Sequence, residues 1–321
     1  MKRRAFILTV ILAAGAVSCG KTGADVTSRT PITVDAAADR TKAMVPSSVL
    51  PDGYTIYLSS YLVEKNIEAN EGDYFVAEPY TRHGEVWRAT PERYWPLASR
   101  LDFLALACEA DSLDVASRAS WHPENCTQGV EVDVPDGSCL MSELLYASAG
   151  NNYSADGVVP MHFSHSQDWL HIIVNCEDDI LRIDGITVEN AHAGGVLRIT
   201  NGIYVGCEWL YRFSGHSRRD ILVPGSAGVC VEAGVDSCFD VLLPEQEACD
   251  IVIRYSMKSS ADAPWDGAVS ATYRNPAIRD TWYAGMKNTY EYTFSFDAVR
   301  FTATVTDWGE DEQKYVELET E

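Results

Sequence analysis

Apolar and polar residues alternate over short segments along most of the chain, with turn-forming residues between them. These segments recur about every 8–15 residues and are rich in aromatic and β-branched side chains, as in sandwiches built from many short strands. No long stretch keeps the 3.6-residue period of an amphipathic helix. The pattern therefore predicts an all-β chain of two tandem β-sandwiches rather than an α/β sheet. The clearest predicted strands cover 53–63, 74–80, 84–89, 101–108, 158–165, 169–176, 181–188, 194–200, 202–207, 238–243, 250–257, 290–296 and 299–305.

The first twenty residues have the composition of an export signal. Three basic residues at 2–4 precede an apolar run over 5–17, and small residues lead to Cys19. The run is too short to cross a bilayer of about 30 Å as a helix. Residues 16–19 (AVSC) resemble a bacterial lipobox, which implies removal of residues 1–18 and a lipid on Cys19. An ordinary secretory signal, cut nearby, is the alternative.

A single alternating segment follows the signal and is isolated from the other predicted strands. Ile32, Val34 and Ala36 share one face, as in a half-buried strand. Basic residues lie on both sides, at Arg29 and Arg40, so a trypsin-like protease could remove this strand and leave a sheet with an open edge. We therefore divide the chain into a signal (1–18), a propeptide strand with a linker (19–48), an N-terminal sandwich (49–180) and a C-terminal sandwich (181–321).

Charge and cysteine content narrow the function. The formal net charge is −22 and becomes −25 when the three basic residues leave with the signal. Such a surface repels nucleic acid, so a nucleic-acid partner is not expected. Of nine cysteines, eight remain beside Cys19, and export permits disulfides, although buried free thiols fit equally well. No Cys-x-x-Cys occurs, which argues against a zinc ribbon or a redox motif.

No set of residues indicates catalysis, a metal or another cofactor. His162 and His165 would lie on opposite faces of one strand, and His171 follows in the next, so they do not form a chelating pattern. The segment 225–228 (GSAG) is one residue too short for a nucleophile elbow. We expect the protein not to be an enzyme. Eight tryptophans would suffice for a glycan platform, with Trp265 and Trp282 expected to be the most exposed.

Five segments, in order along the chain, resemble motifs of the bacterial fimbrillin family. A Tyr-Trp-Pro precedes an apolar strand, a Leu-Leu-Tyr-Ala segment follows, and an apolar-x-Phe-x-His strand and a C-terminal strand pair complete the set. They occupy 94–107, 143–147, 160–165, 288–294 and 305–308. The eight remaining cysteines and the short connection at 166–168 depart from the family pattern.

This resemblance implies a fold and a mechanism. The fold is two transthyretin-like β-sandwich domains, and the protein is an outer-membrane lipoprotein precursor exposed at the cell surface. A trypsin-like surface protease cuts off the first strand after a basic residue, and an extended C-terminal segment of another subunit fills the vacated groove. Arg40 stands where that cut is expected, and Arg29 is the second candidate. The product is a fimbrium (pilus) that serves cell adhesion.

The C-terminal tail contains a candidate donor strand. Val316 and Leu318 would point to one side of an extended strand, and Tyr315 and Glu317 to the other. The tail can equally be the last strand of its own domain. The sequence thus predicts a fimbrial subunit precursor assembled by strand exchange. The alternative is a lipid-anchored monomeric surface module that binds a glycan or another ligand.

Overall fold

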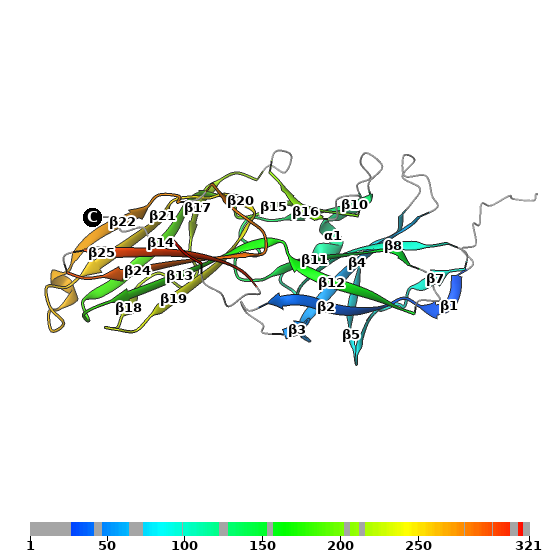
Figure 1. The fold of residues 1–321 in the computed structure, drawn as a ribbon, viewed down its shortest axis with the longest axis horizontal. Helices are drawn as coiled ribbons and strands as arrows, with labels where there is room; N and C mark the ends of the chain where they lie inside the picture. The colour runs from blue at the N-terminus through cyan, green and yellow to red at the C-terminus, as the bar shows by residue number, and fades with distance from the viewer. Residues whose placement is uncertain are drawn as a thin grey trace, which may run out of the picture.

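The computed structural model describes residues 27–41, 47–63, 73–97, 99–121, 128–152, 157–201, 206–211, 216–278, 280–296, 298–308 and 314–316. Nearly all of its regular structure is β-strand, arranged in two units that lie end to end along the long axis of the molecule (Figure 1). This confirms the prediction of an all-β chain with two β-sandwich domains. The signal sequence and Cys19 lie outside the described residues.

The N-terminal unit is organised around one large sheet that closes on itself. Strand β2 pairs with β6 on one side and with β12 on the other, so the two ends of the strand series meet. In order across the sheet the strands are β12 (Val158–His165), β11 (Leu144–Asn152), β8 (Leu101–Glu109), β4 (Tyr54–Leu62), β5 (Asp73–His83), β6 (Val86–Ala89), β2 (Thr33–Thr41) and β3 (Ser47–Val49).

A second sheet covers the outer face of this closed sheet. Aliphatic side chains of β8 on one side, and of β10 and β15 on the other, form the core between the two layers. A one-turn helix, α1 (Val115–Arg118), begins at Asp114, whose carboxylate accepts a hydrogen bond from the Ser117 backbone N–H at 3.3 Å. The second sheet runs β16 (Gly206–Leu210), β15 (Gly195–Asn201), β10 (Gln128–Val134), β9 (Ala119–Trp121), and β1 (Thr27–Pro31) pairs separately with β7 (Tyr94–Pro96).

The C-terminal unit is a sandwich of two five-stranded sheets with an aromatic core that includes Trp282, Tyr292 and Phe294. One sheet runs β19 (Ser237–Pro244), β13 (Gln167–Cys176), β24 (Met286–Phe294), β25 (Val299–Asp307), β26 (Lys314–Val316). The other runs β17 (Arg219–Leu222), β14 (Leu181–Ala191), β21 (Ile251–Met257), β22 (Val269–Asn275), with β18 (Val229–Val231) also on β14. Short elements are β20 (Gln246–Glu247), β23 (Thr281–Trp282) and the 3₁₀ turn η3 (Trp265–Gly267).

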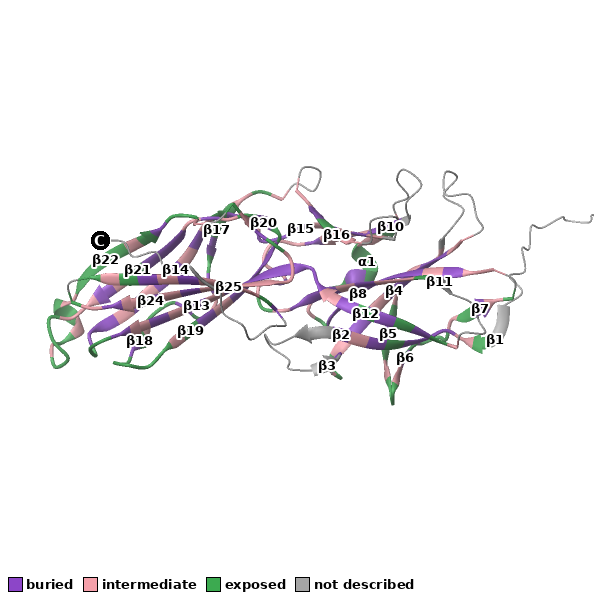
Figure 2. Cartoon of the chain, in the orientation of Figure 1, coloured by how far each residue is buried: buried purple, intermediate pink, exposed green. Residues whose placement is uncertain are grey.

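The period-two pattern of the sequence produces this layering. In β24 the side chains of Asn288, Tyr290, Tyr292 and Phe294 are buried, and those between them are partly exposed. Figure 2 shows buried positions concentrated in the strands and exposed ones mainly in the connecting segments. Strand β8 departs from the alternation, with seven of its nine residues buried, because both of its faces are covered by other layers.

The two units are joined by a nearly continuous strand. Only Ser166 separates β12 from β13, and it is fully buried. Its backbone N–H and hydroxyl both donate to the carbonyl of Leu144, at 3.0 and 2.8 Å, and its own carbonyl accepts from Trp209 Nε1. Sheet pairing does not follow chain order around residue 180. Strand β13, which precedes that residue, belongs to a C-terminal sheet, whereas β15 and β16, which follow it, belong to an N-terminal one.

Two further findings concern membrane-spanning helices and disulfides. Within the described part of the chain, no helix is long and apolar enough to cross a membrane. The seven cysteines that the structure describes all carry free thiols: Cys108, Cys139, Cys176, Cys207, Cys230, Cys238 and Cys249.

Candidate functional site: the closing strand β2

Strand β2 and the residue before it place four side chains in the N-terminal core. Ile32, Val34, Ala36 and Ala38 are all buried, and Val34 is fully inaccessible. Asp35 between them is exposed. The segment therefore alternates as expected of a strand with one face on a core and one on solvent. Two large side chains are followed by two small ones along the inner face.

The pairing of β2 is unequal on its two sides. Toward β12 it forms a parallel ladder of six residue pairs, from Thr33–Val158 to Ala38–Phe163. Elsewhere it makes three pairs: Val34 with Trp87 of β6, and Ala37 and Thr41 with Val49 and Ser47 of β3. Its neighbours elsewhere in the closed sheet are all antiparallel. Strand β2 is thus the element that joins the two ends of the sheet, held mainly by β12.

The core that β2 covers contains large aromatic side chains. Trp87, Trp95, Phe103 and Phe163 are all 2% exposed or less and belong to the same core cluster as the inner face of β2. Trp87 and Phe163 lie on the neighbouring strands β6 and β12, as the register partners of Val34 and Ala38. Without β2, these rings and the backbone donors and acceptors of β12 would be open to solvent.

The two basic residues proposed for processing occupy different strands. Arg29 lies in β1, which pairs with β7 through Thr27–Pro96 and Pro31–Tyr94. Arg40 lies near the end of β2, beyond the ladder to β12. Between them, the Ile32 N–H donates to the Arg93 carbonyl at 2.7 Å. A cut after Arg40 separates β2 from the body, whereas a cut after Arg29 leaves β2 attached.

The structure places part of the candidate donor segment in its own C-terminal domain. Tyr315 and Val316 lie in β26, which pairs antiparallel with β25 through Thr304–Tyr315 and Ala303–Val316. Leu318 lies outside the described residues. Of the two alternatives from the sequence, pairing within its own domain is the arrangement seen in this single chain.

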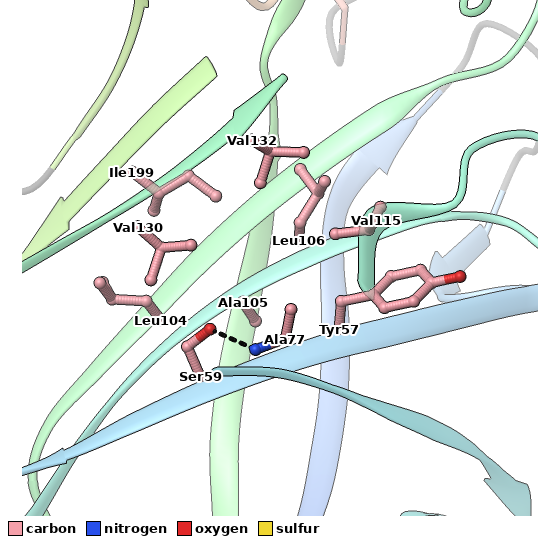
Figure 3. Close-up of a pocket in the computed structure, with 10 residues that line it drawn as sticks. All are labelled: Tyr57, Ser59, Ala77, Leu104, Ala105, Leu106, Val115, Val130, Val132 and Ile199. Atoms are coloured by element: carbon pink, nitrogen blue, oxygen red, sulfur yellow. Dashed lines mark hydrogen bonds between the residues drawn. The ribbon is translucent and has the colours of Figure 1, made fainter. Parts of the chain in front are cut away.

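A hollow between the two N-terminal layers has an apolar lining. It measures about 210 Å³, including open space, and lies between the large sheet and the β10–β15 layer (Figure 3). Ser59 Oγ is its main polar atom and accepts a hydrogen bond from the Ala77 N–H at 2.9 Å. The lining carries no acid, base or nucleophile pair. The residues are Tyr57, Ser59, Ala77, Leu104, Ala105, Leu106, Val115, Val130, Val132 and Ile199.

The three histidines singled out from the sequence have different surroundings. His162 is exposed and His165 is buried, on opposite faces of β12. Burial lowers the pKa of His165 to about 3, and its ring contacts Trp308 with centroids 3.5 Å apart. His171 Nδ1 lies 2.7 Å from the carboxylate of Asp240. Within the described residues, no group of three His, Cys, Asp or Glu side chains could hold a metal ion.

The remaining candidates have structural roles. Ser226, in the elbow-like segment, is fully buried; its hydroxyl donates to the Val223 carbonyl and accepts from the Ile186 N–H. The expectation that Trp282 is exposed was wrong: it is fully buried and donates from Nε1 to the Tyr290 hydroxyl at 3.0 Å. Trp265 is half-buried and lies beside the cations of Arg182 and Lys258. Of the two tryptophans expected to be exposed, only Trp265 is accessible.

Sequence reasoning missed a buried acid near the junction of the two units. Glu143 is 2% exposed, and burial raises its pKa to about 7, although the Tyr54 hydroxyl donates to it at 3.4 Å. It also missed β12 as the parallel partner of β2. No local sequence pattern indicates the burial of Glu143 or the pairing of β2 with β12, because each depends on segments that are far apart in sequence and adjacent in the fold.

Comparison with known proteins agrees with this architecture, a pair of β-sandwiches with a strand-closed N-terminal sheet. Residues 41–308 match a family model described as fimbrillin-like. Because this match spans most of the chain, the protein belongs to the fimbrillin-like family. Membership places it among fimbrial proteins of the cell surface.

Solved structures share the fold at low sequence identity. A fimbrial protein from Bacteroides vulgatus is 14% identical, with a TM-score of 0.51, over 86% of this chain and 99% of that chain. A candidate cell adhesion protein from Bacteroides uniformis is 15% identical, with a TM-score of 0.53, over 87% and 99%. Among curated proteins, none matches this chain.

Proposed function

We propose that this protein is a fimbrial subunit precursor that assembles by strand exchange after proteolysis at Arg40. The observation that carries the proposal is that β2 joins the two ends of the N-terminal sheet, and that Arg40 lies near the end of this strand. The fimbrillin-like match begins at residue 41, immediately after that arginine. This boundary supports the proposal that the segment before residue 41 is the part of the sheet that is replaced.

The energetics favour replacement once the strand has left. Burying a side chain the size of Ile32 or Val34 contributes about 1.5–3 kcal/mol, and each restored hydrogen bond adds about 0.5–1.5 kcal/mol. With six paired positions along β12, the vacated groove offers an incoming strand several kcal/mol. Parallel or antiparallel addition of a strand to such an edge is a general mode of peptide recognition.

The shape of the groove specifies the incoming strand. It should carry large apolar side chains at the two positions of Ile32 and Val34, and small ones at the positions of Ala36 and Ala38. In this chain the donor candidate contains Tyr315, Val316 and Leu318. Donation requires β26 to leave β25, which breaks a ladder of only three residue pairs. Because the ladder is short, breaking it costs little free energy.

The proposal also covers attachment and location. Removal of residues 1–18 and a lipid on Cys19 would hold the precursor at the outer membrane until a trypsin-like surface protease releases the body. Subunits would then join other fimbrial subunits and serve adhesion. No step requires an enzyme activity or a cofactor of this chain.

The test compares cleavage and assembly of three proteins that start after Cys19 and carry Lys42→Ala, which removes the second basic residue after β2: one with no other change (called wild type below), Arg40→Ala and Arg29→Ala. Treatment with a trypsin-like protease, intact mass measurement and size-exclusion chromatography give the readout. We expect the wild type and Arg29→Ala to lose the segment up to Arg40 and to form larger species. Arg40→Ala should keep β2 and stay unassembled.

Two results would contradict the proposal. One is a wild-type protein that is cut after Arg40, releases β2 and remains a stable monomer. The other is assembly of Arg40→Ala at the wild-type rate. A synthetic peptide with the sequence of residues 32–40, added in excess, should block assembly by refilling the groove; the same peptide with Val34→Asp is its matched control.

A further inference from the structure

The C-terminal sandwich has one long sheet edge without the features that usually prevent edge-to-edge pairing. Strand β22 has seven residues and pairs only with β21 among the described strands. Its first four residues are exposed, and Val269 is 72% exposed. Figure 2 shows this strand as an exposed edge of the C-terminal unit. Natural proteins usually protect such edges with charges, prolines, bulges or very short strands.

Most other sheet edges in the described structure are shorter or partly covered; β16, for example, has five residues. Strands β3 and β9 have three residues each, and β17 has four. The long edge strand β19 is partly covered, because its Leu242 N–H donates to the Leu140 carbonyl at 2.8 Å. Strand β25 is covered in part by β26. Strand β22 therefore stands apart as the long, uncovered edge.

The charge of β22 differs from that of the rest of the molecule. The chain carries a formal charge of −22, yet β22 contains no acidic residue. Its single charged residue, Arg274, forms ion pairs with Glu189 and Asp250, at 2.6 and 2.9 Å. Two copies of this acidic protein repel one another over most of their surface, but two β22 strands can approach without like charges facing each other.

The sequence of β22 is also compatible with pairing to itself. In an antiparallel pair centred on Thr272, Thr272 faces its own copy, Ala271 faces Tyr273, and Ser270 faces Arg274. No two charged residues are opposed, and the outermost pair joins Val269 to Asn275. β-branched and aromatic residues at these positions favour strand pairing.

We propose that β22 is a self-association edge, through which two copies of this protein join their C-terminal sheets antiparallel about a two-fold axis at Thr272. The contact is side to side and uses neither β2 nor Arg40, so it is independent of strand exchange. In a fimbria it would link neighbouring filaments rather than successive subunits. The partner is a second copy because the edge is self-complementary in register and charge.

The test uses the Arg40→Ala protein without added protease, so that the chain stays uncut, and measures its mass by sedimentation as a function of concentration. We expect a concentration-dependent dimer. Thr272→Lys places two ammonium groups across the axis and should weaken the dimer by at least about tenfold. Leu222→Lys is the matched control: it changes an exposed apolar residue on β17, at the opposite edge of the same sheet, and should leave the dimer intact.

A second measurement locates the axis. In a Cys126→Ser, Cys230→Ser, Cys238→Ser background, which removes the two exposed thiols among the described residues and the cysteine that lies outside them, Thr272→Cys should give a disulfide-linked dimer under mild oxidation. Leu222→Cys in the same background should not. A protein that stays monomeric at its highest soluble concentration overturns the proposal, as does a dimer that Leu222→Lys weakens and Thr272→Lys does not. Dimerisation that appears only after deletion of residues 309–321 overturns it as well, since the chain's own tail would then occupy the edge.

Discussion

The two domains of this protein each contain one parallel strand pair, and the two pairs differ in how they are secured. In the N-terminal domain β2 lies parallel to β12 over six residue pairs, and it makes only one further pair with β6 and two with β3. In the C-terminal domain β24 lies parallel to β13 over eight pairs and is held on its other side by nine pairs to β25. The C-terminal parallel strand is therefore central, whereas the N-terminal one is weakly held on one flank.

The buried side chains of β2 and β24 differ in the same direction as their strand pairing. Strand β24 inserts Asn288, Tyr290, Tyr292 and Phe294 into its core, and β2 inserts Val34, Ala36 and Ala38 after Ile32. The inner face of β2 buries less apolar area per position, so its departure costs less free energy than that of β24 would. The comparison shows one domain with a strand held mainly by a single neighbour, which is the strand that the proposed exchange would replace, and another domain whose parallel strand is held along both sides.

The largest effect should come from placing a charge on the replaceable strand. Val34→Asp buries an unpaired carboxylate and should destabilise the N-terminal domain by about 3–5 kcal/mol. Calorimetry should then show a lower first transition and an unchanged second one. Asp35→Asn, on the exposed face of the same strand, is the control and should change stability by less than about 0.5 kcal/mol. Equal shifts of both transitions would show that the domains unfold as one unit.

A smaller effect should come from pH, acting on the N-terminal domain through Glu143. Its pKa is about 7 in the folded protein against 4.5 when exposed, so the folded state binds more protons between these values. Taken alone, this group should therefore lower the free energy of unfolding as pH rises from 4.5 to 7. Glu143→Gln removes this loss and should raise stability at pH 7 by about 1–3 kcal/mol, with little change at pH 4.5. Thermal melts at both pH values measure it.

His165 should change the free energy of unfolding with pH in the opposite direction to Glu143, which provides a check on the sign of the Glu143 effect. Its pKa falls to about 3 from 6.5, so its contribution to stability is present above pH 6.5 and is lost as pH falls toward 3. Between pH 4.5 and 6.5 the two groups oppose each other, and the wild-type profile should be nearly flat. A Glu143→Gln protein that shows no new pH dependence in that interval would contradict this assignment.

The smallest effect should come from Ser59→Ala in the hollow between the N-terminal layers. Ala77 adopts a φ of 46°, and its N–H donates to Ser59 Oγ. Removing the hydroxyl leaves a buried donor unpaired, which costs about 1–2 kcal/mol. Urea unfolding followed by tryptophan fluorescence should show the loss in the N-terminal domain. Ser59→Thr, which retains the hydroxyl, should recover most of it.

Much of the fold could be predicted because the signal is local. The period-two alternation of segments such as 158–165 and 290–294 depends only on which face is buried, and the structure shows strands there. Trp282 was misjudged because it lies in a two-residue strand between loops, where no periodicity reports burial. Its burial follows from packing against Tyr290, eight residues away in the chain.

The candidate site could be predicted in part. The sequence indicated an isolated strand at Ile32, Val34 and Ala36, since alternation and flanking basic residues are local features. It did not indicate which strand receives β2, because a parallel pair joins segments more than a hundred residues apart. The membership of β13 and β15 in different domains has the same cause: sheet pairing ignores order along the chain.

The single residue between β12 and β13 has a mechanical consequence. Strand β12 forms the wall of the groove in one domain, and through Ser166 the same backbone becomes a central strand of the other. In a filament built as proposed, tension applied by a strand seated on β12 passes along a covalent chain into β13, then by shear across the ladders to β24 and β25. The subunit would then transmit the load through a nearly continuous strand that runs from one domain into the other.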